Sequence, residues 1–112
     1  MPAEIEKLAK TLKVLGDSNR LGIVMSIGKD SQSVTEIIDS TGLSQTLVSF
    51  HLRTLRNAEI VKTRREGPFI YYSLSETTLI DILHDLSMTV NSTELIVEQI
   101  LDSMPNRLLK KQ

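Results

Sequence analysis

The chain has 112 residues, of which 40% are hydrophobic, and a formal net charge of -1. This is enough apolar material for one core, so we expect a single domain over residues 1–112. The chain has no cysteine, which excludes disulfides, thiolate metal sites, cysteine nucleophiles and thiol redox sensors. It also has no apolar run of about eighteen residues and no signal-peptide pattern, so we expect a cytoplasmic protein that does not associate with membranes.

Two amphipathic helices are predicted before residue 29. The first lies in residues 1–16 and ends at Gly16. Asp17 or Ser18 can cap a second, more apolar helix that Gly28 ends. The apolar side chains of the first helix are Ile5, Leu8, Leu12 and Leu15, which recur at helical spacing.

Residues 33–58 have the pattern of a helix-turn-helix. Ser33 and Glu36 can form a capping box for a short helix that Gly42 breaks. Ser44 can then cap a second helix, which covers most of the remaining range. Two helices joined by a tight, glycine-containing turn are typical of this motif, although they also occur in other α-helical proteins.

Residues 60–74 predict a β-hairpin. The first strand is rich in basic residues, Gly67 and Pro68 form the turn, and the second strand contains the β-favouring segment FIYY. A hairpin that directly follows a helix-turn-helix is a wing. The two tyrosines, Tyr71 and Tyr72, are expected to point to opposite faces of it.

The remaining residues predict helices and a short tail. Residues 75–104 return to a helical pattern, with a cap at Ser75 and an interruption between Asn91 and Thr93. Residues 105–112 are short and basic, and we expect a frayed tail.

Positive charge is concentrated in the middle of the chain. Residues 43–74 contain five basic and two acidic residues, a net charge of +3 in a chain whose total is -1. This predicts one surface for an anionic partner such as nucleic acid, and a solvated charged surface is the alternative. The basic residues are Arg53, Arg56, Lys62, Arg64 and Arg65.

Taken together, these segments resemble the ArsR-type (ArsR/SmtB) family of winged helix-turn-helix transcriptional repressors. The resemblance rests on LGDSNRLGIV, on GLSQTLVSFHLRTLRNAEIVKTRREG and on IYYSL, which follow one another in this order. It implies a mainly α fold with a small β-hairpin wing, and a homodimer held by residues 1–16 and 75–104. It also implies that the homodimer represses transcription by binding a pseudo-palindromic, double-stranded DNA operator.

Two departures from the family pattern matter. Many relatives carry a cysteine-containing metal motif where this chain has Ser33 to Glu36, so that metal sensor cannot operate here. Many relatives also have glycine where this chain has Glu59, which leaves the end of the recognition helix undetermined. Many family members respond to an inducer, and without cysteines or a histidine cluster a small organic effector, or none, is favoured over a metal.

We expect no metal and no cofactor. Some relatives bind zinc-like ions between their C-terminal helices, but His84 is the only histidine in that part of this chain. Divalent transition metals favour sites with at least two imidazoles or thiolates. The side chains considered for such a site are Asp81, His84, Asp85, Glu94 and Glu98, and solvated helix faces also explain them.

The second helix of the motif carries most of the candidate DNA-binding residues. A turn of about 100° per residue places Val48, Leu52 and Leu55 on one side. His51 falls on the same side, where we expect it at the core margin, with a phosphate contact as the alternative. The opposite side combines polar groups that suit base edges and phosphates with one aromatic ring, Phe50. The full candidate set is Ser44, Gln45, Thr46, Ser49, Phe50, Arg53, Arg64 and Arg65.

Several alternatives stay open at this stage. The Phe50 ring can contact thymine methyl groups or a sugar edge, or it can merely cover a neighbouring side chain. Arg64 and Arg65 alternate along a strand, so at most one of them faces DNA. The second functional hypothesis is a protein-interaction module with Phe50 as its anchor. An enzyme is not expected, because the chain has no phosphate-binding loop and no catalytic triad pattern.

Overall fold

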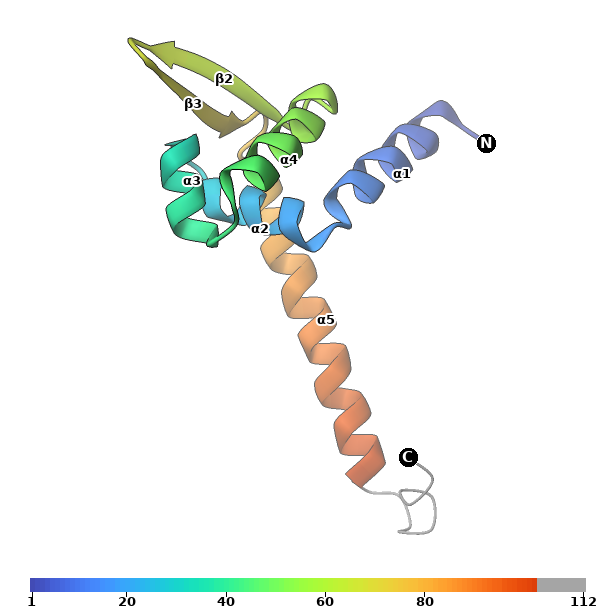
Figure 1. The fold of residues 1–112 in the computed structure, drawn as a ribbon. Coiled ribbons are helices and arrows are strands. Elements are labelled where there is room, and N and C mark those ends of the chain that lie inside the picture. The colour runs from blue at the N-terminus through green and yellow to red at the C-terminus, as the bar shows by residue number, and fades with distance from the viewer. Residues whose placement is uncertain (103–112) are drawn as a thin grey trace. The chain divides into compact units, whose positions relative to one another are not determined.

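The computed structural model describes the backbone of residues 1–102 and the side chains of residues 1–91 and Asp102. The predicted tail, residues 105–112, lies outside this range. The chain divides into two compact units, with the boundary between Ile80 and Asp81. The elements are α1 (Ala3–Leu15), α2 (Ser18–Ile27), β1 (Ser31–Ser33), α3 (Val34–Thr41), α4 (Gln45–Asn57), β2 (Val61–Glu66), β3 (Phe69–Leu74) and α5 (Thr78–Asp102) (Figure 1).

Side-chain caps begin three of the helices, as the sequence predicts. The Asp17 carboxylate accepts a hydrogen bond from the backbone N–H of Arg20 at the start of α2, at 3.0 Å. At the start of α3, Ser33 and Glu36 form the reciprocal capping box. Each cap satisfies a backbone N–H that the first turn of a helix leaves without a partner. At the end of α3, Gly42 adopts the left-handed conformation, with φ of 72°, which favours glycine.

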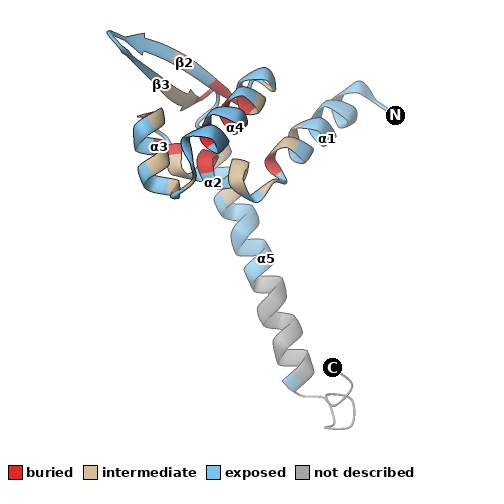
Figure 2. Cartoon of the chain, in the orientation of Figure 1, coloured by how far each residue is buried: buried red, intermediate tan, exposed pale blue. Residues whose placement is uncertain are grey.

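The core of the first unit lies between α2, α3, α4 and the base of the wing. Figure 2 shows buried residues gathered in these elements, whereas the wing tip is exposed. The side chains that are almost completely buried are Ile23, Val24, Ile37, Val48, Leu52, Leu55 and Leu74. They come from helices and strands distant in the sequence, so the helix-turn-helix and the wing share one core.

The sheet has three strands in the order β1-β3-β2, and both strand pairs are antiparallel. The hairpin of β2 and β3 confirms the predicted wing. The strand β1 was not predicted, because its three residues, Ser31 to Ser33, are polar and have no strand pattern of their own. They pair with Tyr71 to Ser73 of β3, a contact that depends on the tertiary fold.

Two predictions for the C-terminal helix were wrong. Ser75 does not cap it: the Ser75 N–H donates to the Ile60 carbonyl at 2.9 Å, which closes the base of the wing, and α5 begins at Thr78. The interruption expected between Asn91 and Thr93 is also absent from the structure, in which α5 continues through these residues to Asp102. Asn, Ser and Thr lower helix propensity by less than about 1 kcal/mol each, too little to end a helix rich in leucine and isoleucine.

The helix α1 and the start of the second unit leave apolar side chains exposed. In α1, Leu15 is buried, whereas Ile5, Leu8 and Leu12 are each more than half exposed. The second unit exposes Ile82, Leu86, Met88 and Val90 along α5. No helix in the described part of the chain is long and apolar enough to cross a membrane.

Candidate nucleic-acid interface

The helix α4 has one buried face and one exposed face, as its periodicity predicts. Val48, Leu52 and Leu55 are at most 1% exposed and anchor the helix in the core. The other face presents an open hollow of about 410 Å³, lined by Gln45, Thr46, Ser49, Phe50 and Arg53. The core therefore holds five of the candidate side chains in one row that is open to solvent.

The start of α4 adds favourable electrostatics to this row. The Ser44 hydroxyl accepts a hydrogen bond from the Leu47 N–H at 3.2 Å, so its first role is to cap the helix. The hydroxyl hydrogen stays available to donate to a further partner. The remaining N–H groups and the helix dipole make this end attractive to an anion such as a phosphate.

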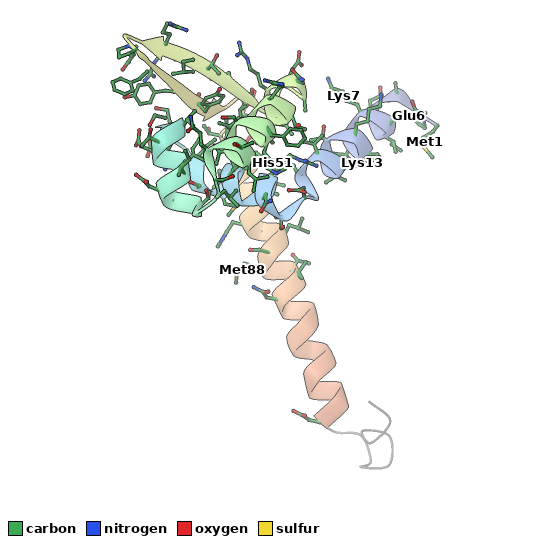
Figure 3. The ribbon with its side chains drawn as sticks, viewed as in Figure 1. Met1, Glu6, Lys7, Lys13, His51 and Met88 are labelled. Atoms are coloured by element: carbon green, nitrogen blue, oxygen red, sulfur yellow. The ribbon has the colours of Figure 1, made fainter. Side chains whose placement is uncertain are left out.

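His51 belongs to the core and not to the exposed face. It is 5% exposed, and Figure 3 labels it within the helical part of the first unit. Its Nδ1 lies 3.5 Å from a terminal nitrogen of Arg20. Since a guanidinium can only donate hydrogen bonds, the histidine nitrogen accepts this one. The interpretation of His51 as a residue of the core margin is confirmed.

Arg20 connects α4 with the end of α1 and the start of α2. Besides its contact with His51, its Nε donates to the Val14 carbonyl at 2.6 Å. Its backbone N–H bonds the Asp17 carboxylate, and this hydrogen bond holds the pKa of Asp17 below its ordinary value of 3.8. This basic residue is therefore committed to the interior framework, and the exposed face of α4 does not use it.

Phe50 covers a neighbouring side chain and also leaves much of its ring exposed. Its ring meets the His51 ring edge to face, with 5.2 Å between the centroids and an interplanar angle of 72°. It therefore covers part of the histidine. It is nevertheless 58% exposed, so most of the ring faces solvent beside Thr46 and Arg53.

The end of α4 resolves the question that Glu59 raises. Glu59 has a φ of 61° and is the only non-glycine residue with positive φ in the described chain. Its N–H donates to the Arg56 carbonyl, and the Ile60 N–H donates to the Leu55 carbonyl. This is a Schellman motif with glutamate in the position that favours glycine. Ile60 and Leu55 are both buried, and a hydrophobic pair at these two positions frequently accompanies the motif.

The two wing arginines lie on opposite faces of the hairpin. Arg64 pairs with Tyr71 in the strand register, and Arg65 pairs with Ile70. The guanidinium of Arg64 lies 5.3 Å from the centre of the Tyr71 ring and its Nε lies 3.1 Å from the Glu66 carboxylate. Tyr71 and Tyr72 also point to opposite faces, as predicted.

Arg56 and Lys62 contribute to the net positive charge of residues 43–74 but were not among the predicted DNA-binding residues. Both are exposed in the structure. Arg56 extends the basic surface toward the end of α4, and Lys62 continues it at the base of the wing. Helical periodicity alone could have placed Arg56 near Ser49, since the two are seven residues apart.

No cluster of three or more His, Cys, Asp or Glu side chains that could hold a metal ion occurs among the described residues. Of the side chains considered for such a site, Asp81, His84 and Asp85 are exposed on α5. Glu94 and Glu98 lie outside the described side chains.

Comparison with known proteins decides the family. Residues 17–63 match the model of the bacterial regulatory proteins of the arsR family. The transcriptional activator HlyU of Vibrio cholerae is 34% identical over 88 residues, which cover 76% of this chain and 82% of HlyU. The chain belongs to the arsR family. Its members are described as regulatory proteins, which agrees with the prediction that the chain is not an enzyme.

Solved structures of similar proteins confirm the fold, and a further relative is similar in sequence. The solved structure of HlyU superimposes with a TM-score of 0.72 at 32% identity, over 77% of this chain and 97% of HlyU. A homodimeric winged helix-turn-helix DNA-binding domain from Mycobacterium bovis gives a TM-score of 0.68 at 28% identity, over 83% and 85% of the two chains. The arsenical resistance operon repressor of Staphylococcus aureus is 29% identical over 92 residues, or 82% of this chain and 88% of the repressor.

Proposed function

We propose that this arsR-family protein is a homodimeric transcriptional repressor that binds a pseudo-palindromic, double-stranded DNA operator in a sequence-specific manner. The observation that carries the proposal is the exposed face of α4. Its five aligned side chains are held by a fully buried opposite face and are followed in the chain by a basic wing. Such a regulator acts on chromosomal DNA, so the proposal includes a cytoplasmic location.

The exposed row of α4 has the chemistry of a major-groove reader. Gln45 can bond adenine, Thr46 and Ser49 suit several base edges, and Arg53 can bond guanine or a phosphate. In helix-turn-helix proteins the N-terminal part of the second helix contacts the bases. Gln45, Thr46 and Ser49 lie in the first half of α4, and Ser44 directly precedes it. Phe50 adds an apolar surface for thymine methyl groups or sugar edges.

A second copy of the chain is the partner that best explains the exposed apolar side chains. Exposed stripes of leucine and isoleucine on helices normally mark interaction surfaces. Such stripes occur on α1 and, separately, on α5. The M. bovis neighbour is described as homodimeric, which supports the same assembly here. Two copies related by a two-fold axis would also match a pseudo-palindromic operator.

The proposed direction of regulation is repression. The S. aureus relative is named as a repressor, whereas HlyU is named as an activator, so a reporter gene behind the operator provides the direct test. Higher reporter expression after deletion of the protein would support repression, and lower expression would contradict it. A small organic effector stays a prediction.

A mobility-shift series with DNA from the promoter of the protein's own gene tests the DNA-binding proposal. The wild-type protein should bind a promoter segment more tightly than a scrambled sequence. Arg53→Ala should weaken specific binding by about 1–3 kcal/mol. The matched control is Lys10→Ala, which removes a positive charge from the face of α1 opposite its apolar stripe and should leave binding unchanged.

Two outcomes would contradict this proposal. Equal binding to promoter segments and scrambled DNA would remove the sequence-specific function. The second outcome is an affinity of this protein for its binding partner that barely changes between low and moderate salt concentration. This would favour the alternative, a protein-interaction module anchored by the exposed Phe50.

A further inference from the structure

We propose that Arg65 is the wing arginine that binds a DNA phosphate, and that Arg64 acts within the wing and does not contact DNA. The inference rests on the proposed DNA-binding function and identifies the wing residue that serves it. It follows from the strand register, the partners of each guanidinium and the charges on each face of the hairpin.

The strand register gives the wing two different faces. Arg65 shares a face with Ile70, Thr63 and Tyr72, and at the base of the wing the same face carries Val61 and Leu74. These last two side chains are buried, at 2% and 1% exposed, so this face is turned toward the helices. The strand β2 contacts α4, and β3 contacts α2 and α3.

Arg64 lies on the other face and already has two contacts within the wing. Its Nε is 3.1 Å from the Glu66 carboxylate, and its guanidinium lies over the Tyr71 ring at 5.3 Å. A phosphate bound by Arg64 would lie beside the Glu66 carboxylate, which repels it and already offsets the charge of the guanidinium. Because Arg64 and Glu66 have opposite charges, the pair adds no net charge near the tip of this face, and the remaining positive charge there is that of Lys62 at the base of the wing.

Arg65 has the opposite surroundings. It is exposed, and no other described residue forms a hydrogen bond or an ion pair with it. Its neighbours on the same face, Thr63, Ile70 and Tyr72, are uncharged, so no acidic group offsets its charge there. A phosphate can therefore take the full charge of this guanidinium without breaking an existing contact, and binding releases a counterion from the DNA.

The test compares Arg64→Gln with Arg65→Gln, which make the same chemical change at adjacent positions. Binding to the operator fragment is measured by fluorescence anisotropy over a series of salt concentrations. Arg65→Gln should reduce the slope of log K against log salt by about 1.8, because each of the two copies in the proposed homodimer loses one phosphate contact worth about 0.9. Arg64→Gln should leave that slope unchanged. Arg65→Lys should restore the slope, because one phosphate contact needs only a positive charge.

Thermal unfolding of each variant shows whether the wing change has damaged the fold. Arg64→Lys provides a second variant at this position if Arg64→Gln unfolds, and its slope should equal that of the wild-type protein. Equal slope reductions for the two glutamine variants, or a reduction for Arg64→Gln alone, would overturn the inference and leave the proposed function intact. A wild-type protein that fails to distinguish operator from scrambled DNA would instead overturn the proposed function.

Discussion

The helices α1 and α4 both have thirteen residues and both are amphipathic, but they use their apolar stripes differently. In α4, Leu52 is 1% exposed, whereas in α1 Leu8 is 58% exposed. Figure 2 shows the contrast, with buried residues along α4 and mostly exposed residues along α1. The same periodicity therefore marks a stripe that is buried in the core in α4 and a stripe that is exposed in α1.

The difference shows what an amphipathic pattern can and cannot indicate. An amphipathic pattern identifies a helix whose apolar face must be buried, but it does not say whether the residues that bury this face come from the same chain. The apolar face of α4 packs against α2, α3 and the wing. We propose that a second copy of the chain buries the apolar face of α1. Four predictions test this comparison, beginning with the largest expected effect.

Leu→Ala substitutions at the two contrasting positions test the comparison most directly. Leu52→Ala should lower the free energy of unfolding by about 3 kcal/mol, because it leaves a cavity in a packed core. Leu8→Ala should change the stability of a single subunit by less than about 0.5 kcal/mol. Any further loss should depend on protein concentration, because it would come from association. Urea denaturation at several protein concentrations measures both effects, and equal losses would contradict the comparison.

A charge in the apolar stripe of α1 tests the proposed homodimer. Leu12→Lys should weaken association roughly 10- to 100-fold, because it removes an apolar side chain from the interface and buries a charge there. Analytical ultracentrifugation measures the change, and circular dichroism should show unchanged helix content. Lys10→Gln, on the opposite face of α1, is the control. An unchanged dissociation constant for Leu12→Lys would place the dimer interface elsewhere.

The end of α4 offers a stabilising change. Glu59→Gly should raise the free energy of unfolding by about 1 kcal/mol, because the left-handed conformation disfavours a residue with a Cβ atom. Glu59→Ala removes the same charge but keeps the Cβ atom, so it should not give this gain. Thermal or urea unfolding compares the two variants. If they gave the same stability, charge and not backbone conformation would explain the effect.

Phe50 is an exposed aromatic residue on a helix that buries Val48, Leu52 and Leu55, and its substitution should have only a small effect on stability. Phe50→Ala should change the free energy of unfolding by less than about 1 kcal/mol, since most of the ring is exposed. It should nevertheless reduce the preference for A·T pairs at particular operator positions, if the ring contacts thymine methyl groups. Binding to operator variants with single base changes measures this. An unchanged preference would assign the ring to covering His51.

The parts of the fold that depend on short stretches of sequence were predicted well. The capping box of Ser33 and Glu36, the cap at Ser44 and the hairpin around Gly67 all depend on residues within four positions of each other. The two faces of α4 follow in the same way from helical periodicity. Such local patterns determine backbone geometry whatever the rest of the chain does.

Two features were missed because a residue's partner lies far away in the sequence, whereas the interruption expected between Asn91 and Thr93 was wrong because the local loss of helix propensity is too small to end α5. Ser75 was expected to cap a helix, but its N–H bonds Ile60 across the base of the wing. The polar strand β1 exists because β3 offers it an edge. The sequence left open whether Glu59 could adopt a left-handed conformation, and the structure shows that it does, with the backbone hydrogen bonds of a Schellman motif and a buried Ile60 after it.

By itself, the amino-acid sequence determined the helix-turn-helix, the wing, the row of candidate side chains on α4 and the exclusion of cysteine chemistry, because these depend on composition and local periodicity. Only the tertiary structure decided that His51 contacts Arg20, that Arg64 is paired with Glu66 whereas the Arg65 guanidinium has no partner among the described residues, and that the apolar stripe of α1 stays uncovered. Each of these depends on contacts formed when distant segments pack together, and local periodicity carries no information about them.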